Sequence, residues 1–133
     1  MLVIDASCLF EIVADTERAE PVRRRVADDP DHAAPHLVDA EVLAVIRRFY
    51  LAGHLDATAA DQAVDDLREW PGERYGHRGL LPRAWELRDT VRSWDALYVA
   101  LAEALGATLV TADARLAATP GPTCSIELVG ATS

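Results

Sequence analysis

Four acidic residues stand where a folded chain could gather carboxylates for chemistry: Asp5, Glu41, Asp95 and Asp113. Carboxylate oxygens are hard ligands that favour Mg²⁺ or Mn²⁺ over Zn²⁺, and the four histidines show no zinc-ligand spacing. A divalent cation held by carboxylates suits phosphoryl chemistry, because it polarises the phosphate, lowers the pKa of a bound water and steadies the leaving oxygen. These residue types therefore predict a metal-assisted site, provided that the fold brings the four side chains together.

Such a cluster is electrostatically unfavourable on its own. Two carboxylate charges about 5 Å apart repel by roughly 3 kcal/mol at an effective dielectric constant of about 20, and four charges make six pairs. The total could rival the whole stability of a domain, about 5–15 kcal/mol, whereas a helix N-terminus returns only about 0.3–1 kcal/mol. We therefore expect protons or a bound cation to offset the repulsion.

Two of the acids follow predicted strands. Residues 2–4 and 107–111 are short apolar runs typical of buried strands; Asp5 follows the first directly, and Asp113 follows the second after one alanine. If these strands are parallel neighbours, both carboxylates lie beyond the carboxyl ends of the strands, where open α/β sheets bind ligands. Each residue could instead simply cap the helix predicted after it, because aspartate is a favoured N-cap.

The other two acids lie in predicted helices. Glu41 is on the edge of the apolar face of an amphipathic helix over 38–51, and Asp95 opens a helix over 94–105 that is apolar nearly all round. A buried helix that begins with an acid needs a reason. The alternatives are an ordinary surface glutamate for Glu41 and a favourable interaction with the helix dipole for Asp95.

Two hydroxyl residues flank the predicted site. Ser7 follows Asp5 by two positions, and Thr111 precedes Asp113 by two. Either hydroxyl could donate a hydrogen bond to a carboxylate or to a metal-bound water. The alternative for both is local turn and cap hydrogen bonding, to which we give equal weight for Ser7.

The whole pattern of short apolar strands between helices predicts one α/β domain over residues 1–133, with a short, mainly parallel sheet of four to five strands. Ser93 is the expected N-cap of the helix over 94–105, and Gly106 is expected to end it. The remaining predicted elements are helices over 6–13, 16–27, 56–70, 81–91 and 113–118, an edge strand over 73–77, a last strand over 125–129 and a loop over 31–36.

Composition argues against several classes of protein. The net charge of -9 is unfavourable for membrane surfaces and for nucleic acids held by bulk charge alone. All basic residues are arginine, so Walker-type NTPases and other phosphoryl-transfer domains that rely on a lysine are excluded. There is no Gly-x-Ser-x-Gly motif for a serine hydrolase. No apolar run could span a bilayer, and Asp5 would interrupt a signal peptide, so we expect a cytoplasmic protein.

Four segments, taken in order, resemble the PIN-domain ribonucleases, most closely the toxins of VapBC-type toxin–antitoxin systems. Together they extend over nearly the whole chain, and their order is more specific than any one of them. The segments are Val-Ile-Asp-Ala-Ser (3–7), His-Leu-Val-Asp-Ala-Glu-Val (36–42), Trp-Asp-Ala-Leu-Tyr-Val-Ala-Leu-Ala-Glu (94–103) and Ala-Thr-Leu-Val-Thr-Ala-Asp-Ala-Arg-Leu (107–116).

The resemblance implies a PIN-like three-layer α/β/α sandwich and an endoribonuclease that depends on Mg²⁺ or Mn²⁺. It assigns the supporting hydroxyl of the family to Thr111. It also implies an RNA substrate, a homodimer, and a cognate antitoxin that blocks the site after docking on the apolar helices near residues 10–60. It assigns the four acids of the family to Asp5, Glu41, Asp95 and Asp113.

Other functions remain open at the level of sequence. A non-catalytic PIN-like binding module could keep the fold and use its acids structurally, and a nuclease acting on DNA or a phosphatase would need the same residues. A substrate with phosphate groups also needs cationic contacts, although for any single arginine the solvated surface role is the commoner one. The arginine candidates are Arg23 to Arg25, Arg47, Arg48, Arg83, Arg92 and Arg115.

Overall fold

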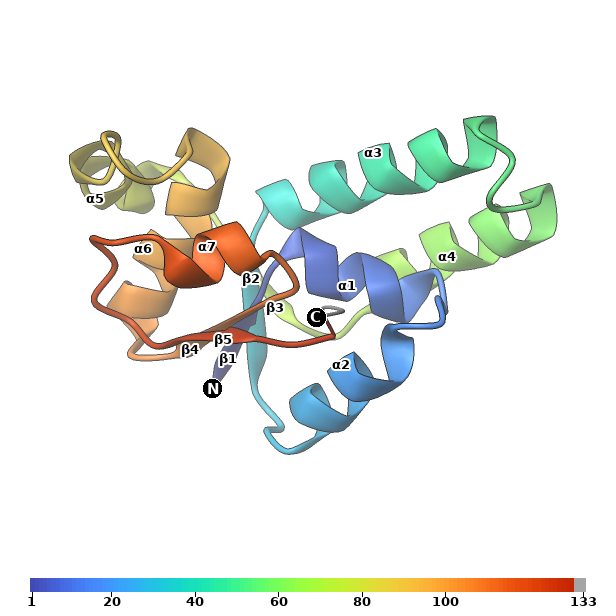
Figure 1. The fold of residues 1–133 in the computed structure, drawn as a ribbon, viewed down its shortest axis with the longest axis horizontal. Helices are drawn as coiled ribbons and strands as arrows, with labels where there is room; N and C mark the ends of the chain where they lie inside the picture. Colours follow the sequence, from blue (N-terminus) through green and yellow to red (C-terminus); the bar gives the residue numbers. More distant parts are fainter. Residues whose placement is uncertain (131–133) are drawn as a thin grey trace.

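The computed structural model describes residues 1–130 and has a five-stranded sheet in which every pairing is parallel. The strand order is β3-β2-β1-β4-β5, so the chain starts in the middle of the sheet (Figure 1). The predicted α/β class and parallel sheet are confirmed. The strands are β1 (Leu2–Ile4), β2 (His32–Pro35), β3 (Glu73–Tyr75), β4 (Thr108–Thr111) and β5 (Ile126–Leu128).

Helices cover both faces of this sheet, which confirms the three-layer arrangement. The chain moves outward from β1 to β3 through four helices and then returns to β4 through two others, so right-handed crossovers place the two groups on opposite faces. The outward group is α1 (Ala6–Val13), α2 (Ala19–Ala27), α3 (Leu37–Leu51) and α4 (Ala57–Glu69). The return group is α5 (Leu81–Glu86) and α6 (Ser93–Leu105), and the 3₁₀ turn η1 (Arg78–Leu80) precedes it. The short helix α7 (Ala114–Ala118) connects β4 to β5.

The core lies between β1 and the helices on each face. All residues of β1 are buried, and α6 is buried along most of its length. Because α6 packs against β1, β2 and β4, the apolar side chains on most sides of this helix are buried, as the sequence predicts. Figure 1 shows α3 and α4 running side by side and extending past the sheet, with α1 packed against both.

The predicted loop over 31–36 is wrong, because His32–Pro35 forms β2 between β1 and β3. Ala33 and Ala34 are weak strand formers and gave no strand signal. They are buried completely, or nearly so, and because consecutive strand side chains point to opposite faces, the two small side chains lie against helices on both sides of the sheet, where β2 contacts α6 and α3. The formation of this strand therefore depends on tertiary packing and not on the intrinsic strand propensity of its residues.

Several helix boundaries differ from the predictions. The second helix begins at Ala19, not 16, and α5 ends at Glu86, not 91. Ser93 is the first residue of α6, and Arg92 holds the N-cap position without a capping side chain. Gly106 does end α6, in the left-handed conformation with φ +62° that glycine adopts readily. Within residues 1–130, no helix is both long and apolar enough to cross a membrane.

Candidate active site

A pocket of about 200 Å³ lies beyond the carboxyl ends of β1 and β4. These two strands are parallel neighbours, and the strand order reverses between them, which is the usual ligand position in open α/β sheets. The structure thus brings all four predicted acids together. The lining residues are Asp5, Ala6, Ser7, Glu41, Val45, Asp95, Tyr98 and Asp113.

Asp5 is the buried centre of this carboxylate pocket. Its Oδ1 accepts hydrogen bonds from the Cys8 backbone N–H at 3.1 Å and from Ser7 Oγ at 2.6 Å, and its Oδ2 accepts one from Thr111 Oγ1. Burial nevertheless raises the pKa of Asp5 to about 6, since desolvation of the charged form outweighs the three hydrogen bonds. Asp5 therefore both caps α1 and presents to the pocket a carboxyl group that loses its proton at a higher pH than a free aspartate does.

The two flanking hydroxyls join α1 to the turn after β4. Thr111 Oγ1 accepts a hydrogen bond from the Asp113 backbone N–H at 3.0 Å while donating to Asp5, and Ser7 Oγ accepts from the Ala112 N–H at 3.0 Å. The carboxylate contact and the local turn bonding predicted as alternatives are therefore both present. Because of this double use, the position of Asp113 depends on the hydroxyl that also holds Asp5.

Glu41 has a partner that sequence reasoning missed. Tyr98 Oη donates a hydrogen bond to Glu41 Oε1 at 2.7 Å. Burial raises the pKa of Glu41, the Tyr98 bond opposes that rise, and the charges of Asp95 and Asp5 add to it. Burial and Glu41 also raise the pKa of Tyr98, so its phenol stays protonated and remains a donor. The sequence signal that could have identified this partner is the phenol of Tyr98 in an otherwise apolar helix, because a buried tyrosine hydroxyl usually has a hydrogen-bond partner.

Asp95 and Asp113 complete the lining of the pocket. Asp95 lies in the first turn of α6, and its pKa is raised by burial first and by the charge of Asp113 second. Asp113 caps α7 by accepting from the Arg115 N–H at 2.9 Å, and the Arg115 side chain lies 3.6 Å from the same carboxylate. The capping and dipole roles are thus real, but they leave carboxylate oxygens lining the pocket.

The donor set fits a hard divalent cation. Asp5, Glu41 and Asp95 all have raised pKa values, and within residues 1–130 none of them forms an ion pair. A bound cation would offset the free-energy cost of burying these carboxylates in their charged form, and it would reduce the repulsion between them. In the described part of the chain, no three acidic, histidine or cysteine side chains are already close enough to hold a metal ion. Ion binding therefore requires the carboxylates to turn inward.

Thr111→Val is expected to raise the pKa of Asp5 further above its value of about 6, because valine keeps the shape of the side chain but removes a donor to the charged carboxylate. The check is an NMR titration of the Asp5 carboxyl carbon in metal-free protein. Thr58→Val, on the exposed surface of α4, is the control and should leave that titration unchanged. An unchanged or lower pKa in Thr111→Val would contradict the role given to this hydroxyl.

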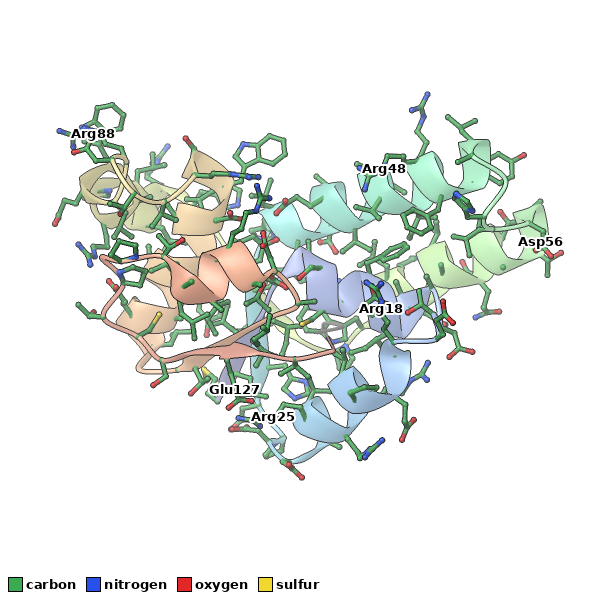
Figure 2. The ribbon with its side chains drawn as sticks, in the orientation of Figure 1. Arg18, Arg25, Arg48, Asp56, Arg88 and Glu127 are labelled. Carbon is green, nitrogen blue, oxygen red and sulfur yellow. The ribbon has the colours of Figure 1, made fainter. Side chains whose placement is uncertain are left out.

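Of the arginine candidates, Arg92 and Arg115 lie beside the acids. Together with Asp95 and Asp113 they line an adjoining pocket of about 200 Å³, here called the arginine pocket. Arg25 and Arg83 pair with carboxylates away from the site, Glu127 and Glu103, whereas the carboxylate that Arg115 contacts is Asp113 of the site itself. Figure 2 shows the Arg25–Glu127 pair beside α2, and Arg48 on α3. Phosphate contacts next to the acids are therefore available from Arg92 and Arg115.

Comparison with known proteins agrees with this arrangement. The PIN domain model matches residues 2–122. Ribonuclease VapC3 of Mycobacterium tuberculosis is 45% identical over 87% of this chain and 85% of the relative. Ribonuclease VapC1 of the same organism is 41% identical over 96% of each chain.

Solved structures show the same fold at lower identity. The crystal structure of Mycobacterium tuberculosis VapC20, a toxin that cleaves the sarcin–ricin loop, superposes with a TM-score of 0.68 at 20% identity, over 89% of this chain and 94% of that one. PAE2754 from Pyrobaculum aerophilum superposes with a TM-score of 0.67 at 22% identity, over 95% and 82%. The family model, the identities and the fold agree, and the chain belongs to the PIN-domain family, among the VapC ribonucleases.

Proposed function

We propose that this protein is the toxin of a type II toxin–antitoxin pair, an endoribonuclease that uses Mg²⁺ or Mn²⁺ to hydrolyse RNA phosphodiesters with an activated water. The observation that carries the proposal is the meeting of four carboxylates in one pocket at the switch point of the sheet. Membership of a family of ribonucleases supports RNA as the substrate.

The proposed roles follow from the surroundings of each acid. Asp5, Asp95 and Asp113 would hold the cation, which when bound polarises the phosphate and lowers the pKa of a coordinated water. Ser7 and Thr111 fix the direction of the Asp5 carboxylate. Glu41 would hold a second ion or orient the attacking water, and its raised pKa makes it a stronger base than a free glutamate.

Substrate binding has to work against an acidic protein. With a net charge of -9, long-range attraction of RNA is absent. Arg92 and Arg115 instead supply local positive charge next to Asp95 and Asp113. We propose that they contact the phosphates on either side of the cleaved bond, where a guanidinium can donate two parallel hydrogen bonds.

The antitoxin is proposed to cover the helices near residues 10–60. Several large apolar side chains are exposed on α3 and α4, and a partner helix or strand would bury them. A homodimer is proposed from the family resemblance, and a cytoplasmic location is proposed as expected from the sequence. The exposed side chains are Leu43, Tyr50, Leu51 and Val64.

The test is a cleavage assay on a panel of single-stranded RNA, the same sequences as DNA, and a simple phosphate monoester. We expect cleavage of RNA with Mg²⁺ or Mn²⁺, none in excess EDTA, and a loss of at least about 100-fold in Asp95→Asn. Asp89→Asn, on an exposed turn, is the matched control. RNA cleavage that persists in EDTA or in Asp95→Asn would refute the mechanism, and cleavage of DNA or of the monoester instead would refute the substrate.

A further inference from the structure

A pocket of about 270 Å³ between α5 and the start of α6 is not used by the mechanism above. We call it the indole pocket, because Trp85 and Trp94 both line it while remaining 67% and 61% exposed. Large exposed apolar surface of this kind usually marks a binding site. The full lining is Leu81, Ala84, Trp85, Arg88, Ser93, Trp94 and Leu97.

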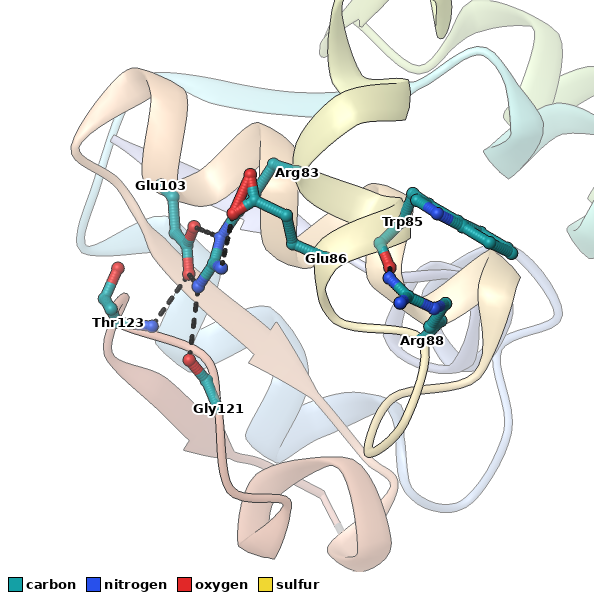
Figure 3. A network of polar contacts seen from close by, with 7 residues as sticks. All are labelled: Arg83, Trp85, Glu86, Arg88, Glu103, Gly121 and Thr123. Carbon is teal, nitrogen blue, oxygen red and sulfur yellow. Dashed lines mark hydrogen bonds and ion pairs between the residues drawn. The ribbon is translucent and has the colours of Figure 1, made fainter.

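The α5 wall of this pocket is fixed from behind. Figure 3 shows Arg83 donating to the Glu103 carboxylate, at 2.6 Å from Nε and 3.2 Å from Nη2, and also to the Gly121 carbonyl oxygen. The Thr123 N–H donates to the same carboxylate at 2.7 Å. Trp85 is two residues after Arg83, about 200° further around the helix, so the clamped face of α5 leaves the indole on the other side.

Arg88 completes the aromatic side of the pocket. Its guanidinium lies over the Trp85 ring at 4.6 Å from the centroid, and its Nη1 donates to the Trp85 carbonyl oxygen at 3.0 Å (Figure 3). Indole rings and guanidinium planes are the groups on which proteins stack unpaired bases. The pair therefore combines a stacking surface with a positive charge.

The indole pocket is adjacent to the proposed catalytic acids. In the four consecutive residues 92–95, Arg92 and Asp95 line the arginine pocket, whereas Ser93 and Trp94 line the indole pocket. One turn at the start of α6 thus separates the two. An RNA strand that places a phosphate against Arg92 and Asp95 would bring a neighbouring nucleoside to Trp94.

We propose that the indole pocket binds an unpaired nucleobase of the RNA substrate next to the cleaved phosphate, with Trp85 and Trp94 as residues that determine specificity for unpaired RNA. The inference rests on the proposed function. Stacking suits this protein because its net charge of -9 gives no bulk attraction, while a stacked base contributes affinity without protein charge. The pocket volume is near the lower end of small-ligand sites, about 300–1,000 Å³, which fits a single base, and bases inside a duplex cannot enter.

The test compares Trp85→Ala and Trp94→Ala with wild type, by KM and kcat on a single-stranded oligonucleotide and on the same sequence in a duplex. We expect KM for the single strand to rise about 5- to 150-fold, the equivalent of about 1–3 kcal/mol per stacked base, with little change in kcat. Cleavage positions should change as well. Trp94→Phe should retain most of the affinity, and the rate of cleavage of the duplex, whatever its wild-type value, should be the same in all variants.

Leu128→Ala is the matched control, since this large apolar residue is 44% exposed on β5 and lines none of the three pockets described above. Unchanged KM and cleavage positions in both tryptophan variants would overturn the proposal. The alternative occupant is a second copy of the chain: if KM changes only together with a shift from dimer to monomer in sedimentation velocity, the pocket is a protein interface and the proposal fails.

A failure of the proposed function would be visible separately. If the wild-type protein cleaves no RNA, quenching of tryptophan fluorescence by a single-stranded RNA oligonucleotide still tests the indole pocket. Quenching that is lost in the double variant Trp85→Ala, Trp94→Ala, and retained in Leu128→Ala, supports base binding without catalysis. No quenching in the wild type would overturn the proposal.

Discussion

Asp5→Asn is expected to abolish RNA cleavage and, at the same time, to stabilise the metal-free protein at neutral pH. Cleavage should fall at least about 100-fold, because even residues that only support a metal ligand contribute about 10- to 100-fold. Folding should survive, since asparagine is as good an N-cap as aspartate and can still accept the Cys8 N–H bond at the start of α1.

The gain in stability follows from the raised pKa of Asp5. The pKa rises from 3.8 to about 6 on folding, so the folded protein holds this proton more tightly than the unfolded chain does. The contribution of Asp5 to the stability of the wild type is therefore lost as the pH rises from about 4 through about 6, by about 3 kcal/mol for this group. Asparagine carries no charge at any of these pH values, so the advantage of the variant should be fully present at pH 7 and vanish towards pH 4.

The measurement is urea unfolding in EDTA at pH 4 and pH 7, beside a cleavage assay with Mn²⁺. Asp56→Asn is the matched control, because Asp56 caps α4 in the same way, accepting from the Ala59 N–H at 2.8 Å, but is exposed. It should change neither cleavage nor the pH dependence of stability. An Asp5→Asn protein that still cleaves RNA, or that is less stable than wild type at pH 7, would contradict this account of the site.

Mn²⁺ or Mg²⁺ is expected to raise the thermal unfolding midpoint, and to do so more at pH 8 than at pH 5. A cation removes the repulsion among Asp5, Glu41 and Asp95, but at pH 5 protons compete for the same carboxylates, whose pKa values are raised. At 100-fold excess over the dissociation constant the stabilisation is about 2.7 kcal/mol, or roughly 10 °C for a chain of this length.

Scanning calorimetry with and without Mn²⁺ at both pH values checks this prediction. The double variant Asp5→Asn, Asp95→Asn should lose the response, and Asp56→Asn should keep it. If Mn²⁺ does not raise the midpoint of the wild type at pH 8, the acids serve only as caps and structural groups. That result would favour the non-catalytic binding module.

The positions of Asp5 and Asp113 could be predicted because they depend on local features. A buried strand that ends at an acid leaves the carboxylate beyond the carboxyl end of the strand, and parallel pairing of β1 with β4 then brings two such ends together. Asp95 could be placed by the apolar helix that follows it. These arguments need only the periodicity of the hydrophobic residues along the chain and the relative direction of the strands.

The partners of these acids could not be predicted in the same way. Tyr98 and Glu41 are 57 positions apart, and which hydroxyl points at which carboxylate depends on how α3 and α6 pack. The strand β2 was missed for a similar reason, because Ala33 and Ala34 become strand residues only between β1 and β3. Trp85 and Trp94 gave no functional signal, since exposure is a property of the folded surface.

The most direct test of the central claim is a crystal structure of the protein in saturating Mn²⁺, with the ion located by its anomalous scattering. We predict Mn²⁺ in the carboxylate pocket, coordinated by oxygens of Asp5, Asp95 and Asp113, with the side chains turned inward from their present positions. A carboxylate pocket that stays empty under those conditions, or Mn²⁺ bound only elsewhere, would contradict the claim that these acids form a metal-dependent active site.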